Sequence, residues 1–230
     1  MRRSHSLFLA LLLAAPANAQ DQPPTSELEE SLGRPKRVPV IPAELRAMVQ
    51  EASRDRLAIR MLGGSVTAID ISQFEPEDFR QYGDGRFLGF SFRGYEFYGY
   101  MLVDRAMAGV TSVIDTGEAP VFSPDGRHFA AVQTSGAGFG NLEGLGIWAL
   151  RPAGSVQIFS SDVLPQGEEW RIDGWPRADC VSVSWLERPA NSPEPAPDRH
   201  HFGVEIGEQV TIRHNYSFPG CNVIDAIDNG

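Results

Sequence analysis

The sequence contains an internal repeat in which a tight turn leads into two β-forming runs, and this repeat limits the folds open to the chain. The first copy spans 82–90 and is followed by a second run at 100–104. The second copy spans 122–132 with a run at 147–150, and a degenerate third spans 175–183 with a run at 202–206. Because one such unit cannot bury its own apolar face, we expect each copy to form a small sheet that packs on its neighbour.

Further strand signals precede the repeats. Leu57, Ile59 and Met61 alternate with Ala58 and Arg60, and the alternation returns over 66–71. Gly63-Gly64 between these runs predicts a hairpin turn. The runs 87–92 and 95–103 are rich in aromatic residues, which favour strands. Together with the Gly, Pro, Asp and Ser residues that separate them, these runs predict an all-β fold of repeated antiparallel β-sheets.

One helix is expected on the N-terminal side of the sheets. Leu45, Met48, Val49 and Ala52 fall on a single stripe of a helix, and Pro42 precedes them where its missing N–H costs little. The pattern predicts a helix over 43–54.

The second turn carries a recognisable motif. Its sequence is Ser123-Pro124-Asp125-Gly126, with Pro120-Val121-Phe122 before it and Phe129-Ala130 after it. It resembles the blade motif of TolB-type, WD40-like β-propellers, and Gly83-Asp84-Gly85-Arg86 is a partial match. In the motif the proline presets φ, the aspartate bonds its own backbone and the glycine takes a positive φ.

This resemblance implies a propeller or a partial propeller. Closed propellers have four or more blades. The chain shows three copies, with the strands at 57–71 as a candidate for a fourth. A β-sandwich built from the same hairpins is the alternative fold, and closure through a dimer remains open.

The first residues indicate export. A basic start at Arg2 and Arg3 is followed by a short apolar run and by small residues that end at Ala19, as in a secretory signal peptide. We expect a signal peptide at 1–19, a flexible lead-in at 20–41 and a single β-repeat domain at 42–230. The predicted location is the periplasm or the exterior of the cell, and no later segment is long and apolar enough to span a membrane.

Charge and cysteine content narrow the function. The net charge of −10 disfavours binding to nucleic acid and to anionic membrane surfaces. Cys180 and Cys221 are the two cysteines, and in an oxidising compartment they predict one disulfide. Such a bond contributes roughly 4 kcal/mol for a loop of this length, and it ties the C-terminal tail to the domain.

No residue pattern matches a known catalytic or metal-binding constellation. The sequence has no Gly-x-Ser-x-Gly, and the neighbouring His200 and His201 point to opposite faces if they lie in a strand. We therefore expect no metal site and no cofactor. The acidic clusters 75–78 and 168–169 leave open a hydrolase of envelope polymers, either glycan or peptide, and the aromatic run leaves open a carrier of small ligands.

The sequence favours a non-catalytic exported protein that binds an as yet unidentified protein partner in the periplasm or envelope. Aromatic residues occupy both faces near 95–100, so some of their rings are expected at the surface beside arginine. We expect the loops near 93–96 and 136–144 to carry the contacts. The candidate binding residues are Arg93, Tyr95, Phe97, Phe139 and Asn141.

Overall fold

Antiparallel strands make up most of the chain in the computed structural model. The structure describes residues 36–95, 97–107, 109–133, 142, 144–161, 168–186, 199–214 and 221. The expected signal peptide and most of the expected lead-in therefore lie outside the described residues. No helix in the described part of the chain is long and apolar enough to cross a membrane.

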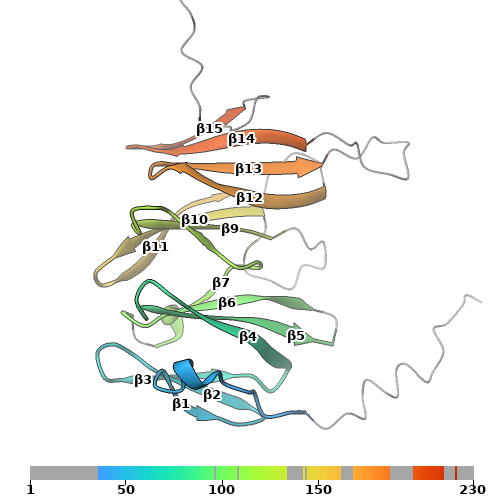
Figure 1. Ribbon diagram of the computed structural model, residues 1–230, viewed down its shortest axis with the longest axis vertical. Coiled ribbons are helices and arrows are strands. Elements are labelled where there is room, and N and C mark those ends of the chain that lie inside the picture. The colour runs from blue at the N-terminus through green and yellow to red at the C-terminus, as the bar shows by residue number, and fades with distance from the viewer. Residues whose placement is uncertain are drawn as a thin grey trace, which may run out of the picture. The chain divides into compact units, whose positions relative to one another are not determined.

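The strands form four separate sheets that follow one another in chain order (Figure 1). The first sheet has three strands: β1 (Val49–Ala52), β2 (Arg56–Arg60) and β3 (Val66–Asp70). The second contains β4 (Phe74–Tyr82), β5 (Phe87–Gly94), β6 (Tyr98–Asp104) and β7 (Val113–Asp115). The third contains β8 (Val121–Phe122), β9 (His128–Gln133), β10 (Gly144–Arg151) and β11 (Gly154–Ser161). The fourth contains β12 (Glu168–Arg177), β13 (Cys180–Leu186), β14 (Arg199–Ile206) and β15 (Val210–His214).

The repeat read in the sequence corresponds to these sheets. In the second, third and fourth sheets, the repeated turn joins the first strand to the second, and the later β run is the third strand. The strands at 57–71 form the first sheet, as a fourth unit. Four small sheets in sequence confirm the prediction of an all-β, partial propeller-like fold in place of a β-sandwich.

The Ser-Pro-Asp-Gly turn has the local geometry that its residues predict. Asp125 Oδ1 accepts hydrogen bonds from the Arg127 N–H at 3.0 Å and from Ser123 Oγ at 2.7 Å. Ser123 Oγ in turn accepts from the His128 N–H at 2.9 Å, and Gly126 has a φ of 65°. Side chains thus satisfy the backbone groups that the reversal from β8 to β9 would leave unpaired.

Three hydrophobic clusters join successive sheets. The first lies between the first two sheets and includes Leu57, Ile59 and Phe90. The next joins the second and third sheets through Phe87 and Phe129, and the last joins the third and fourth. Within the described ranges, none of the three clusters links the first sheet to the fourth.

The predicted helix is much shorter than expected. A single 3-10 turn spans Ala43–Leu45, and strand β1 begins at Val49, so the prediction of a helix as far as residue 54 is wrong. Leu45 and Met48 are buried as the apolar stripe requires. The 3-10 turn and the turn at 46–48 that follows it place both side chains on the core equally well, and β1 then gains backbone hydrogen bonds by pairing Val49 with Ile59. Tertiary pairing outweighs the helical spacing.

A buried carboxylate links the second and third sheets. The Asp104 side chain is fully buried at the end of β6 and accepts two hydrogen bonds from Arg86, both at 2.9 Å. Asp104 Oδ2 also accepts from the N–H and the Oγ of Ser155 in β11, at 2.8 and 2.7 Å. Arg86 donates further to the Arg151 carbonyl at 2.7 Å. Burial opposes ionisation of Asp104, but the hydrogen bonds from Arg86, Ser155 and the Ala106 N–H hold its pKa below its ordinary value.

The expected disulfide is present between Cys180 and Cys221. Both cysteines are buried, and Arg177 Nη1 donates to the Cys221 carbonyl at 2.9 Å. The bond fixes residue 221 at the start of β13, which confirms the predicted pairing.

Replacement of Asp104 by asparagine tests the link between the sheets. Asp104→Asn leaves the Arg86 guanidinium without its counter-charge, so we expect the free energy of unfolding to fall by about 3 kcal/mol at neutral pH in urea titrations. Because folding lowers the pKa of Asp104, its contribution is complete above the unfolded carboxyl pKa of about 4 and is lost as the pH falls through the folded pKa. The difference in free energy of unfolding between wild type and Asp104→Asn therefore becomes smaller at acid pH.

The control is Asp55→Asn, which removes an exposed carboxylate 3.9 Å from Lys36 Nζ. We expect this substitution to lower the free energy of unfolding by less than about 0.5 kcal/mol. Equal losses at the two positions would contradict the role given to Asp104.

Candidate functional site

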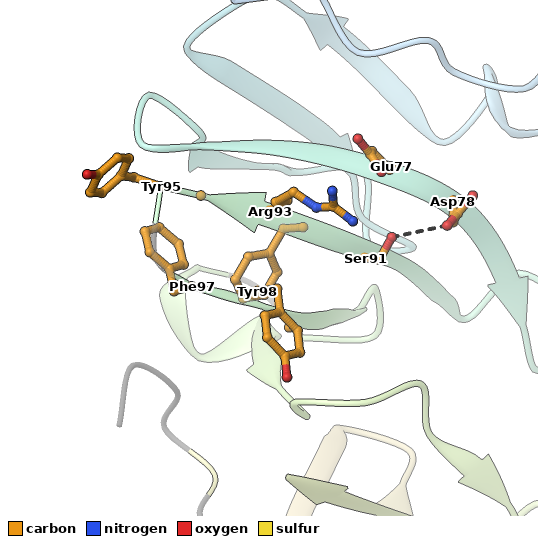
Figure 2. Close-up of a pocket in the computed structure, with 10 residues that line it drawn as sticks. Glu77, Asp78, Ser91, Arg93, Tyr95, Phe97 and Tyr98 are labelled. Atoms are coloured by element: carbon orange, nitrogen blue, oxygen red, sulfur yellow. Dashed lines mark hydrogen bonds between the residues drawn. The ribbon is translucent and has the colours of Figure 1, made fainter. Parts of the chain in front are cut away.

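A surface hollow of about 560 Å³ lies over strands β4, β5 and β6 of the second sheet (Figure 2). One face of β5 builds its floor. Phe90 and Phe92 point into the core shared with the first sheet, so Ser91 and Arg93 point to the opposite face. On the same face, at the start of β5, Phe87 packs against the third sheet. The hollow therefore lies on the part of the face beyond Phe87, where Arg93 is exposed.

The hairpin between β5 and β6 depends on two glycines. The Gly94 N–H donates to the Phe97 carbonyl at 2.7 Å and closes the turn. A Cβ on Gly94 would lie 2.3 Å from the Phe97 ring, and one on Gly99 would lie 2.7 Å from the Phe92 ring. Only glycine at these positions lets the two rings lie across the hairpin.

Aromatic side chains of this hairpin divide into anchors and exposed rings. The Phe97 ring lies 6.1 Å from that of Phe92, which lies 5.1 Å from that of Phe74 in the core. Tyr95 and Tyr98 are 61% and 65% exposed. Figure 2 shows both tyrosines on the hairpin side of the hollow. Large rings held on an anchored hairpin form a preorganised contact surface.

Two carboxylates form the opposite wall, on edge strand β4. A β-bulge interrupts the pairing of β4 with β5 between Glu77 and Arg80. Asp78 in the bulge has a φ of 50°, a left-handed conformation that non-glycine residues seldom adopt. The bulge lets Glu77 and Asp78 both line the hollow while Phe79 is buried against Phe90 at 5.3 Å. Strain of this kind is concentrated at functional sites in proteins.

The charges of the hollow are available to a ligand. Ser91 Oγ donates a weak hydrogen bond of 3.4 Å to Asp78 Oδ2. Glu77 and Arg93 are exposed, and no other described residue forms an ion pair or hydrogen bond with either side chain. Arg93 projects between the carboxylate wall and the tyrosines (Figure 2).

A tyrosine pair supports the sheet beside the hollow. The hydroxyls of Tyr82 and Tyr100 are 2.8 Å apart, and the Tyr82 ring stacks on Phe122 of the third sheet. Burial, followed by the hydrogen bond with Tyr82, raises the pKa of Tyr100 well above its ordinary value. Tyr100 thus stays protonated and supports Tyr82, whose ring contacts the third sheet.

The structure gathers three of the five predicted binding residues at this hollow. Arg93, Tyr95 and Phe97 all line it. Phe139 and Asn141 fall outside the described residues. Among the remaining lining residues, the sequence singles out neither Ser91 nor Tyr98 as a binding residue, and it indicates the acids of β4 only as candidate catalytic groups. Alternation along β5 places Ser91 beside Arg93, but only the strand register brings Glu77 opposite Ser91 and Tyr98 opposite Arg93.

The other candidate chemistries do not converge. His200 stacks on Trp185 at 5.1 Å, while His201 Nδ1 lies 3.1 Å from Asp173 on the opposite face of β14. Within the described ranges, no three His, Cys, Asp or Glu side chains are grouped so as to hold a metal ion. The side chains of Glu168 and Glu169 are outside the described part of the chain.

Comparison with known proteins adds little to this geometry. No protein-family model matches the sequence, and no curated protein matches it. Among solved structures, a putative 6-phosphogluconolactonase from Bacteroides fragilis is similar at 9% identity with a TM-score of 0.36. The match covers 70% of this chain and 51% of that protein, so the chain spans about half the length of the protein it matches. A likeness at this level carries no argument about function.

Substitution of Asp78 tests whether the strained bulge serves binding. Glycine adopts a left-handed φ without steric cost, so Asp78→Gly is expected to raise the free energy of unfolding by up to about 1 kcal/mol. It also removes a carboxylate from the hollow and should weaken binding of the partner. Asp84 has the same φ of 50° in the turn between β4 and β5, outside the hollow.

Asp84→Gly is therefore the matched control, expected to change stability by a similar amount and to leave binding unchanged. Urea titration and a binding assay on both variants measure the two effects. Equal effects of both substitutions on binding would show that the Asp78 carboxylate has no special role.

Proposed function

We propose that this chain is an exported, non-catalytic β-repeat protein that binds a partner protein of the periplasm or envelope through the hollow on β4–β6. The observation that carries the proposal is the pair of exposed tyrosines on a hairpin anchored in the core, next to an arginine without an ion-pair partner among the described residues. Tyrosine and arginine are, together with tryptophan, the residues enriched among those that dominate the binding energy of protein interfaces.

Export is supported by two independent features. The basic and apolar start that ends at Ala19 has the form of a signal peptide. Cys180 and Cys221 are joined in a disulfide, which persists in oxidising compartments. The proposed location is the periplasm or the exterior of the cell.

The Ser-Pro-Asp-Gly turn at 123–126 supports placement of the chain among the TolB-type, WD40-like repeat proteins. Its hydrogen bonds follow the pattern that the motif requires, and the chain forms a partial propeller-like fold. Repeat proteins of this kind present surfaces to partners from a rigid scaffold, but a fold alone does not fix a function. The proposal therefore depends on the hollow.

Removal of the exposed rings tests the proposed function. Tagged mature protein, residues 20–230, is used to capture a stoichiometric partner from an envelope extract of its source, and the affinity is then measured with purified components. Tyr95→Ala and Tyr98→Ala each delete a large contact ring, so each should weaken binding by about tenfold or more, with little change in unfolding midpoint.

Leu62→Ala is the control, because Leu62 is 58% exposed in the turn between β2 and β3, away from the hollow. Unchanged affinity of both tyrosine variants would reject the hollow as the binding site. Specific turnover of a glycan or peptide by the purified protein, lost on substitution of Glu77, would reject the non-catalytic assignment in favour of a hydrolase.

A further inference from the structure

We propose that the occupant of the hollow is an extended, positively charged segment of the partner protein, whose basic side chains lie between the carboxylates of β4 and the tyrosines of the β5–β6 hairpin. This inference rests on the proposed function and specifies the chemistry of the partner. It follows from the charges, the aromatic rings and the strand edges that surround the hollow.

The balance of charge at the hollow favours a cation. Glu77 and Asp78 line it, against the single positive charge of Arg93. Just outside the hollow, the sheet register places Glu75 opposite Arg93 and Arg80 opposite Gly89, so these two charges offset each other and the excess of one carboxylate within the hollow remains. The protein as a whole carries a net charge of −10. Both the local and the overall field therefore attract a basic segment and repel an acidic one.

The aromatic wall complements the same ligand. Tyr95 and Tyr98 are largely exposed, so their ring faces can receive ammonium or guanidinium groups, and the alkyl stems of lysine and arginine can pack on the rings. A basic side chain thus finds a carboxylate on one side and an aromatic ring on the other. A purely apolar segment would leave both carboxylates without a partner.

The strand edges favour an extended segment. β7 pairs with β6 only at Met101, Leu102 and Val103, and the Thr116 N–H reaches the Tyr100 carbonyl. At Tyr98 and Gly99, which line the hollow, the outer edge of β6 carries no further strand within the described residues. Because this edge is open, a segment in extended conformation can run across the strands from Tyr98 toward β4, with alternate side chains facing the hollow.

The test uses three synthetic ten-residue peptides with serine and valine at fixed positions and lysine, glutamine or glutamate at the remaining alternate positions. Their binding to mature protein is measured by fluorescence anisotropy at physiological salt. We expect the lysine peptide to bind about tenfold or more tightly than the glutamine peptide, and the glutamate peptide to bind least.

Charge reversal on β4 provides the specific control. Glu77→Lys should lower the affinity for the lysine peptide by about tenfold and raise the affinity for the glutamate peptide, because it reverses the charge at position 77 of the carboxylate wall. Glu208→Lys makes the same change in net charge on the exposed turn between β14 and β15, away from the hollow, and should change either affinity by less than about twofold. Asp78→Asn keeps a residue that tolerates the left-handed φ, so a loss of lysine-peptide binding there is not a folding defect.

Several results would overturn the inference. If Glu77→Lys and Glu208→Lys weaken binding of the lysine peptide equally, the preference for lysine over glutamine and glutamate comes from nonspecific charge attraction and not from the hollow. Tighter binding of the glutamate peptide, lost in Arg93→Ala, would show an acidic ligand and leave the proposed function standing. Binding of a neutral oligosaccharide in place of all three peptides, lost in Tyr98→Ala, would reject a protein ligand and the proposed function with it.

Discussion

The buried carboxylate of Asp104 is the contact on which the arrangement of the second and third sheets depends. Each sheet is small, and backbone pairing within a sheet does not fix how that sheet packs on the next one. Asp104 accepts hydrogen bonds from Arg86 of its own sheet and from Ser155 of the next sheet. Arg86 also donates a hydrogen bond to the Arg151 carbonyl of that next sheet. A buried charge with every hydrogen bond in place tolerates few alternative packings, because a shift of one sheet would leave the carboxylate unpaired.

The hollow follows from the way the second sheet is fixed on both faces. The first sheet covers Phe90 and Phe92, and the third covers Phe87, so β5 is held along most of its length. Beyond Phe87, on the face toward the third sheet, Arg93 and Tyr98 extend into the open part of that face. A surface built on fixed strands loses little conformational entropy when a partner binds. The bulge at Asp78 adds a carboxylate to that surface at the cost of local strain.

Much of the fold could be predicted from the sequence, because recognisable turn residues mark the reversal between the first two strands in the second and third sheets. Ser123-Pro124-Asp125-Gly126 and Gly83-Asp84-Gly85 mark the reversals, and Cys180 and Cys221 pair as expected. The N-terminal helix is shorter than its apolar spacing predicts, because Leu45 in a 3-10 turn and Met48 in the turn after it reach the same burial before Val49 enters a strand. Arg93, Tyr95 and Phe97 could be placed near a surface from local composition. Their approach to Glu77 and Asp78 could not, because it depends on the register of β4 against β5 and on a bulge that no local pattern signals.

The central claim is that a partner protein occupies the hollow on the second sheet. Amide hydrogen exchange, followed by mass spectrometry on the mature protein with and without its captured partner, tests this claim most directly. The account predicts slower exchange in the partner-bound state at 91–99 and around the bulge at 77–79, with unchanged exchange over β13 in the fourth sheet. Protection confined to the fourth sheet, with exchange at 91–99 unaltered, would contradict it.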